Sequence, residues 1–335
     1  MRILALVPGG ISEQLLFFPA LEDIKKAYPD AEIGVVVDPR AKRAYRVSKI
    51  VDTVVPFTFS GKNSPSDWAN LLGTVRDREY EVVISADPQW GTGFMLWLSG
   101  IPTRIAYDST ATPYFYTATV PDTSSDKTQY RAQQYRSLLS AIAKDGSTSD
   151  SSGSDSSGPL VNPKINLPEG DLAWANELRD RLQLQNGYVL LYPGPEGHGD
   201  KSISYPTASW LALIQDFKEK QPQIPVVLLQ TDHSIKQVND LRNEDTQLTV
   251  ATAENLGQSA AIIAGASLVI TPDSYIMQLS VALKVFTLAL FGKHQPSEML
   301  PPITGEETRF LGIASSSPNI EDIAPETVLK KVWGN

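Results

Sequence analysis

Cysteine is absent from this chain, and histidine occurs only three times, as His198, His233 and His294. Without cysteine the protein has no disulfide, no thiol nucleophile and no thiolate-ligated metal, a composition compatible with any redox compartment. No two of the histidines have the spacing of a helical metal-ligand pair, so we expect no metal site.

Positive charge is also scarce, because 29 lysines and arginines stand against 38 aspartates and glutamates, which leaves a net charge of −9. No basic stripe is available to neutralise phosphates, which argues against a nucleic-acid partner. No apolar run approaches the roughly 20 residues that a spanning helix needs, and the N-terminus lacks the order of a signal peptide. We therefore expect a cytoplasmic protein.

Short apolar strands alternate with amphipathic helices in both halves of the chain, which predicts an α/β protein with parallel sheets covered on both faces. In the first half, the predicted strands span residues 3–7, 32–37, 81–85 and 104–107, and the predicted helices span 18–27, 67–76, 91–98 and 128–143. In the second half, strands are predicted over 187–192, 225–229, 247–251 and 267–271, and helices over 171–182, 208–219, 235–243, 275–283 and 325–333.

The two halves are separated by a segment of low complexity. Residues 145–158 contain only Asp, Gly, Ser and Thr, so no apolar side chain is available to anchor them. Such a composition predicts a flexible linker. We therefore place a first domain at residues 1–158, ending in this linker, and a second domain at 159–335.

The most informative segment is 260–292, which reads as helix, strand, sharp turn, helix and strand. Its turn carries Asp273 and Ser274, two residues with the chemistry of a helix N-cap. In open parallel sheets, ligands bind outside the carboxyl ends of the strands, and the N–H groups of a helix start favour an anion such as a diphosphate. The alternative is that Asp273 only caps the helix.

A comparable turn follows the first strand. After residues 3–7 the chain passes through Gly9 and Gly10 and enters a helix near Ser12 and Glu13. Glycines let the backbone approach a ligand closely, and a carboxylate is favoured in the first turn of a helix. The alternative is a tight strand-to-helix turn without a ligand.

Together these segments resemble glycosyltransferase family 9, the ADP-heptose:lipopolysaccharide heptosyltransferases and their relatives. The family's Gly-Asp turn and Pro-Ala-Leu run are matched by residues 9–13 and 19–21, and its second helix-to-strand step by 27–40. The Leu-x-Gly-x-Pro-x-Arg segment is similar to 98–108, the Pro-Gly loop with its Lys and aromatic-Pro pair to 190–206, and the last two signatures to TPDSYIMQLSVAL and LFG.

The resemblance implies the GT-B fold, in which two Rossmann-like domains face each other across a cleft. The first domain would hold the acceptor and the second the nucleotide-sugar donor. The last helix would pack back on the first domain through Val328, Val332 and Trp333. The implied enzyme is a glycosyltransferase with inverting transfer and no essential metal or other cofactor. It would move heptose or a similar sugar from a donor, ADP-linked in the family's named members, to a lipopolysaccharide or cell-envelope glycan, with peripheral contact at the inner membrane.

The resemblance also assigns roles to single residues. Glu13 would be the general base that takes the acceptor's proton, whereas its simpler role is to stabilise its helix. The donor would be bound by Gly194, Lys201, Asp273, Ser274 and Gln278, and the loop facing the cleft would be formed by Gly9, Gly10 and Ser12. Arg104 would support the first sheet. An aromatic set is a candidate lining for the acceptor groove: Trp90, Trp97, Tyr114, Phe115 and Tyr116.

Two departures from the family pattern keep other functions open. Ser12-Glu13 stands where most members have Gly-Asp, and Gln278 stands where they have a histidine. Glutamine can donate a hydrogen bond to a phosphate or sugar oxygen, but it carries no titrating charge. One alternative is therefore a catalytically degenerate binding or scaffold protein. Another is a different nucleotide-sugar enzyme such as a GT-B-type epimerase. His198 and His294 lie in loops that adjoin the two donor motifs, which makes each a candidate for contact with the nucleotide.

Overall fold

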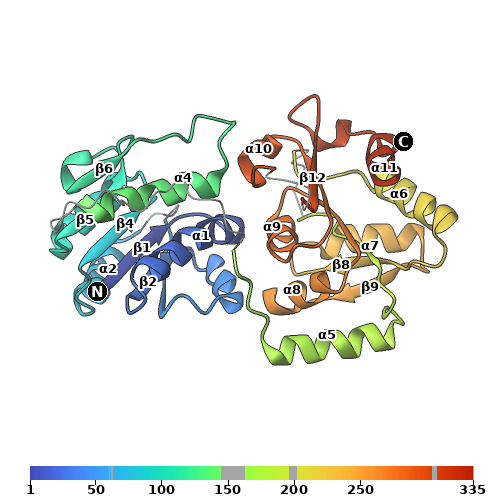
Figure 1. Ribbon diagram of the computed structural model, residues 1–335, viewed down its shortest axis with the longest axis horizontal. Coiled ribbons are helices and arrows are strands. Elements are labelled where there is room, and N and C mark those ends of the chain that lie inside the picture. The colour runs from blue at the N-terminus through green and yellow to red at the C-terminus, as the bar shows by residue number, and fades with distance from the viewer. Residues whose placement is uncertain (60, 62, 145–162, 196–201, 304–307, 335) are drawn as a thin grey trace. The chain divides into compact units, whose positions relative to one another are not determined.

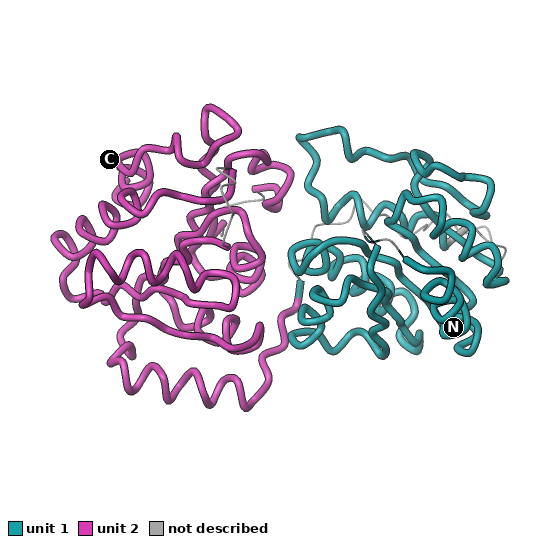
Figure 2. The backbone as a smooth tube through the Cα atoms, turned by 180° about the vertical axis from the view of Figure 1, so that it is seen from behind, with its two compact units in different colours: residues 1–163 teal, residues 164–335 magenta. Residues whose placement is uncertain are grey.

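The computed structural model describes residues 1–334 apart from 60, 62, 145–162, 196–201 and 304–307. The chain forms two compact units, Met1–Pro163 and Lys164–Asn335 (Figure 2). The segment 145–158, which we predicted to be a linker, lies outside the described residues, as do His198 and Lys201.

The first unit is built on a parallel sheet with the strand order β3-β2-β1-β4-β5-β6 (Figure 1). Its central strands are continuous apolar runs because parallel strands are buried on both faces. The strands are β1 (Arg2–Val7), β2 (Glu32–Val37), β3 (Thr53–Pro56), β4 (Val82–Ser85), β5 (Thr103–Tyr107) and β6 (Ala118–Val120).

Helices cover both faces of this sheet. Side chains such as Leu4 and Leu6 pack against α2 (Pro65–Arg76) and α3 (Trp90–Ser99). Because successive strand residues point to opposite faces, Ile3 and Ala5 lie beneath the other layer. That layer holds α1 (Ile11–Ala27), η1 (Ala41–Val47), α4 (Arg131–Ser137) and η3 (Leu138–Lys144), while the short η2 (Pro113–Phe115) lies against α3.

The helices α1 and α4 pack directly against each other. The rings of Phe17 and Tyr135 meet edge to face with centroids 5.3 Å apart. The buried Arg136 guanidinium pairs with Asp23 at 2.5 Å. A bond between a buried guanidinium and a carboxylate is charge-assisted, so it fixes the helix pair more firmly than a neutral contact would.

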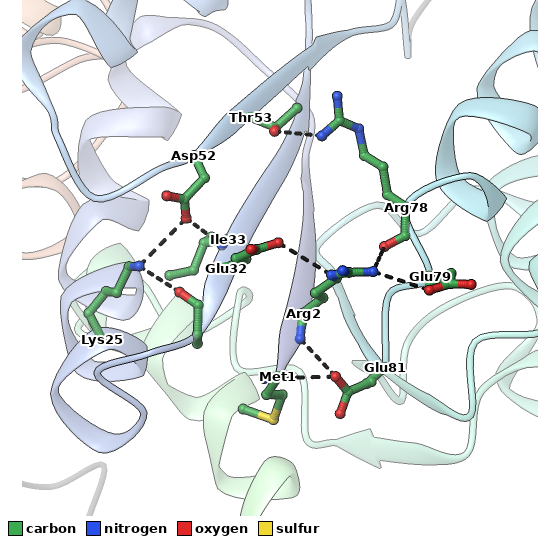
Figure 3. Close-up of polar contacts among 11 residues, drawn as sticks. Met1, Arg2, Lys25, Glu32, Ile33, Asp52, Thr53, Arg78, Glu79 and Glu81 are labelled. Carbon is green, nitrogen blue, oxygen red and sulfur yellow. Dashed lines mark hydrogen bonds and ion pairs between the residues drawn. The ribbon is translucent and has the colours of Figure 1, made fainter.

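The amino ends of the first sheet are tied together by polar contacts (Figure 3). The Arg2 guanidinium pairs with Glu32 and Glu79, each at 3.3 Å, and its backbone N–H donates to Glu81 at 3.1 Å. Asp52 accepts from the Ile33 N–H at 2.8 Å. These groups are largely exposed, so each pair contributes little to stability. Their effect is to align the amino ends of neighbouring strands, at the end of the sheet opposite the strand-to-helix turns.

The second unit repeats the plan with a parallel sheet in the order β12-β11-β10-β7-β8-β9. Its strands are β7 (Val189–Leu191), β8 (Val226–Gln230), β9 (Thr249–Thr252), β10 (Leu268–Pro272), β11 (Thr287–Phe291) and β12 (Phe310–Ala314). Its helices are α5 (Glu169–Arg181), α6 (Thr207–Lys220), α7 (Ile235–Glu244), α8 (Leu256–Ala264), α9 (Tyr275–Ala282), α10 (Pro296–Met299), η4 (Ile320–Asp322) and α11 (Pro325–Trp333).

The core of the second unit lies between its sheet and one helix layer. Trp210 and Phe217 of α6, Leu241 of α7 and Val328 of α11 pack on side chains of β7, β8, β10 and β11. In the remaining layer, α8 contacts both α5 and α9. The α/β class predicted from the alternation is thus confirmed.

Strand order reverses once in each sheet. In the first unit the order runs from β1 outward to β3 on one side and then resumes at β4 on the other. In the second unit the same reversal separates β7 from β10. Connections leave in opposite directions at such a point, so a crevice forms outside the carboxyl ends of the two strands, and ligands of doubly wound sheets bind there.

Several predicted elements differ from the structure. The helix start near Ser12 and the helix predicted over 18–27 belong to one helix, α1, which continues through Pro19. Its buried apolar face compensates for the backbone hydrogen bond that a proline removes. The helix predicted over 128–143 divides into α4 and η3, and β3, β6 and β12 were not predicted. All three are edge strands, and most of their residues are only partly buried or exposed.

The last helix packs within its own unit. Val328 belongs to the core of the second unit, and Val332 and Trp333 pack against that core. The Trp333 indole donates to Asp216 of α6 at 2.7 Å, and its ring lies 5.2 Å from that of Phe217. The structure thus shows the contacts of these three side chains within the second unit. The packing of this helix on the first domain, which the resemblance implies, stays a prediction.

We expect Trp333→Ala to lower the free energy of unfolding by about 2 kcal/mol. Truncation of a fully buried tryptophan costs roughly 3–5 kcal/mol, and this ring is only partly buried. Urea unfolding followed by circular dichroism measures the change. Lys331→Ala, on an exposed position of the same helix, should stay within about 0.5 kcal/mol. Equal effects of the two changes would show that the Trp333 side chain contributes no packing energy.

Candidate active site

The turn after β1 brings the backbone close to side chains of neighbouring segments. Gly9 has φ +107°, a left-handed conformation that side chains rarely adopt, and a Cβ there would lie 2.7 Å from Cγ of Glu13. Its N–H donates to Asp38, which follows β2, at 2.9 Å. Glycine is therefore required at this position for conformation and for space. Gly10 is exposed and Ser12 half-buried at the start of α1.

Glu13 lies in the first turn of α1 at this edge. One carboxylate oxygen accepts from the Gly10 N–H at 2.9 Å, and the other lies 3.9 Å from Nη1 of Arg131 in α4. The side chain keeps 28% of its surface exposed. Glu13 thus stabilises the helix start, as the simpler interpretation requires, and its carboxylate remains partly accessible to solvent.

A cavity of about 220 Å³ opens beside Arg131. It lies at the carboxyl ends of β4, β5 and β6 and against α4, all within the first unit. Hydroxyl and carboxyl groups dominate the residues that line it, among them Ser85, Asp87, Ser109, Thr110, Asp122 and Arg131. None of these residues was predicted from the sequence to belong to a site. Asp87 lies two residues after the strand predicted over 81–85, a position that could have identified it.

In the second unit, the turn after β7 lies against the end of β10. Gly194 has φ +97°, and a Cβ on it would lie 3.1 Å from both the Ile203 carbonyl oxygen and Cγ of Pro272. The predicted Pro-Gly loop and the predicted Pro-Asp-Ser turn therefore meet at the point where strand order reverses. Glycine at 194 makes this close approach possible.

Asp273 forms a pair with His294 at this edge. Its carboxylate lies 2.7 Å from Nδ1 of the imidazole, and its backbone N–H donates to the Leu290 carbonyl at 2.9 Å. The Asp273 side chain is 14% exposed and that of His294 is 36% exposed. With Nδ1 directed at the carboxylate, Nε2 is the ring nitrogen left to bond to another group. Both residues were named from the sequence, but their contact was not predicted.

Ser274 and Gln278 lie on α9, which follows the turn. The Ser274 hydroxyl accepts from the Met277 N–H at 3.4 Å, as an N-cap does. Gln278 is 5% exposed, and its side-chain amide donates to the Met299 carbonyl at 2.9 Å. In this structure Gln278 links α9 to α10, whereas the family resemblance assigned it to the donor.

The other residues named from the sequence serve the first sheet or its surface. The Arg104 guanidinium donates to the Phe115 and Ile101 carbonyls, and burial lowers its pKa. Trp90 and Trp97 are about half exposed, at 56% and 51%, and stack on either side of Phe94. None of the five aromatics proposed for an acceptor groove lines the cavity beside Arg131.

Among the described residues, no group of three or more His, Asp or Glu side chains is placed to hold a metal ion. No helix in this part of the chain combines the length and apolar character needed to span a bilayer.

Comparison with solved structures identifies the fold. The glycosyltransferase family 9 protein of Veillonella parvula DSM 2008 superposes with a TM-score of 0.82 at 18% identity, over 99% of this chain and 96% of that one. The Escherichia coli heptosyltransferase WaaC with ADP gives a TM-score of 0.72 at 17% identity, over 100% and 99%. These likenesses confirm the predicted GT-B fold of two Rossmann-like domains.

Sequence comparison gives two further findings. A curated relative, the chloroplastic photosynthetic NDH subunit of subcomplex B 1 from Arabidopsis thaliana, is 20% identical over 341 residues, which cover 98% of this chain and 72% of the relative. The family model for glycosyltransferase family 9 (heptosyltransferase) matches residues 68–329, well over half of the chain. The chain therefore belongs to glycosyltransferase family 9.

Proposed function

We propose that this protein transfers a sugar from a nucleotide-sugar donor to a hydroxyl group of a glycan acceptor. The observation that carries the proposal is the pair of turns in the second unit where Gly194 lies against Pro272 and the Asp273–His294 pair follows. Family membership supports a glycosyltransferase, and the similar solved structure of E. coli heptosyltransferase WaaC is a structure with ADP. An ADP-linked sugar is accordingly the donor we favour.

The second unit would bind the donor and stabilise its leaving diphosphate. The N–H groups at the start of α9 and the Ser274 hydroxyl offer hydrogen bonds to an anion. Lys201, assigned by motif, would add a positive charge, and Nε2 of His294 a further donor. These groups would stabilise the negative charge that develops on the leaving diphosphate oxygen without a metal ion.

The first unit would activate the acceptor. The hydroxyl oxygen of the acceptor would attack the anomeric carbon of the donor sugar while the bond from that carbon to the diphosphate oxygen breaks. Glu13 would accept the hydroxyl proton, and the diphosphate would leave with the bonding electrons. Attack opposite the leaving group inverts the anomeric centre. The family resemblance suggests a lipopolysaccharide or other cell-envelope glycan as acceptor.

A binding subunit without turnover is the second candidate. It is favoured by the relative named as an NDH subunit, together with Glu13 and Gln278 at positions where the family has other residues. A donor site that still binds but supports no transfer would fit this candidate. The following experiments separate the two.

A matching nucleotide sugar should raise the melting temperature of the wild-type protein by roughly 5 °C at 100-fold excess over its Kd, because it binds the native state alone. Differential scanning fluorimetry with ADP-, GDP-, UDP- and CMP-linked sugars measures the shift. Lys201→Ala should reduce it strongly, whereas Lys331→Ala should not. If none of the four classes shifts the wild type, the donor site is degenerate.

Glu13→Gln should reduce the transfer rate by about 10²–10⁴-fold, the usual contribution of a general base, with donor binding unchanged. The glutamine oxygen can still accept from the Gly10 N–H, so stability should change by less than about 1 kcal/mol. Glu169→Gln, in the first turn of α5, is the matched control. Near-normal turnover in Glu13→Gln would reduce Glu13 to a helix cap.

His294→Ala should weaken donor binding about tenfold, the equivalent of one lost hydrogen bond of 1.4 kcal/mol. Isothermal titration calorimetry measures this affinity. Because Asp273 holds the imidazole, Asp273→Asn combined with His294→Ala should cost little more than the larger single change. Fully additive losses would mean that the two residues act on the donor independently.

A further inference from the structure

The cavity beside Arg131 is a polar chamber of the first unit. Its volume of about 220 Å³ is below the range of roughly 300–1,000 Å³ typical of sites for drug-sized ligands. It lies outside the carboxyl ends of β4 to β6, and β4 flanks the strand-order reversal at which doubly wound sheets bind ligands. A ligand of one small ring matches its size.

Its carboxylates are held in place by the protein's own donors. Asp87 is 2% exposed and accepts from the Thr92 hydroxyl and from the Gln89 N–H, the latter at 3.2 Å. Asp122 accepts from the Ser109 hydroxyl and from the Ser124 N–H, the latter at 2.8 Å. Acceptor groups fixed in this way are pre-organised to receive further hydrogen bonds from a ligand.

The balance of charge in the cavity disfavours an anion. Two carboxylates, Asp87 and Asp122, face a single guanidinium, Arg131. Burial raises the pKa of Asp87, opposed by its hydrogen bonds to Thr92 and Gln89. Burial also acts on Asp122, but hydrogen bonds from Ser109 and Ser124 outweigh it and hold that pKa below its usual value. A phosphate or carboxylate would meet like charge, which costs binding energy.

The cavity adjoins the candidate base. Arg131 lines it and also lies 3.9 Å from the Glu13 carboxylate. Tyr135, one helical turn further along α4, lines it as well. A ring held in the cavity would therefore place a hydroxyl on the side of Glu13.

We propose that this cavity binds the acceptor as an uncharged, hydroxyl-rich sugar ring and selects against phosphorylated and acidic sugars. The inference rests on the proposed transferase function and names the substrate class of its acceptor side. Hydroxyl donors of the ring would bond to Asp87 and Asp122, and the hydroxyls of Ser85 and Thr110 would bond to its oxygens. The exposed aromatics of α3 fit this role less well, because Phe94 has a tryptophan stacked on each side.

The test is saturation-transfer NMR on the full chain with methyl hexosides and heptosides, the corresponding sugar phosphates and uronic acids. Neutral glycosides should bind at least about tenfold more tightly than either anionic class. Ser109→Trp should abolish their binding by filling the cavity. Asp122→Asn should reduce the ratio of affinities for neutral and anionic sugars. If Asp122 had only a structural role, this ratio would not change.

The first unit offers a matched control. A second cavity, of about 240 Å³, lies at the amino ends of the strands, and Asp77 is one of the residues that line it. Asp77→Asn should leave sugar binding and selectivity unaltered. Tighter binding of anionic sugars by the wild type, or neutral binding that survives Ser109→Trp, would overturn the inference.

Failure of the inference is separable from failure of the proposed function. If a nucleotide sugar stabilises the wild type through Lys201 but no neutral sugar binds the cavity, the donor proposal stands and the acceptor inference is wrong. If neutral sugars bind the cavity but no nucleotide sugar binds, the cavity is a sugar site and the transferase function is wrong. The wild-type comparison decides selectivity even if a variant does not fold.

Discussion

The reversal of strand order in each sheet is the constraint on which the candidate residues of each unit depend. In a parallel sheet every strand ends at the same edge, and only where the order reverses do the following connections diverge and leave a crevice. β1 and β4 flank that point in the first unit, and β7 and β10 in the second. The glycine turns, the exposed carboxylate of Glu13 and the Asp273–His294 pair all lie at those two points.

Close approach of the backbone is the second requirement, and glycine meets it. At Gly9 a side chain would collide with Glu13, and at Gly194 it would press on Ile203 and Pro272. Both residues adopt a left-handed φ that other residues pay for in strain. The two turns are thus fixed by backbone geometry. The side chains around them are then free to differ from the family pattern, as Glu13 and Gln278 do, without loss of the fold.

Contacts between elements fix the segments that carry the candidate residues in each unit. The contacts among Arg2, Glu32, Glu79 and Glu81 align one edge of the first sheet, while Phe17, Tyr135, Asp23 and Arg136 fix α4 against α1 at its face. Arg131 and Tyr135 are positioned by that packing, and through them Glu13 and the cavity become neighbours. In the second unit the bond from Gln278 to Met299 holds α10 against α9 in the same manner. Gln278, at a position where the family has histidine, therefore has a structural role in joining these two helices.

The sequence by itself determined the α/β class, most central strands and helices, the glycine turns and several of the polar residues at the sheet edges. These features are local, because apolar periodicity, N-cap residues and left-handed glycines act over a few positions. Tertiary structure alone decided which turns meet: Gly194 against Pro272, Asp273 against His294, and Glu13 beside Arg131. It also decided that Val328 and Trp333 pack on α6 and that Asp87 and Asp122 share one cavity. Such contacts depend on strand order and helix packing, which join residues far apart in the chain and leave no periodic mark on it.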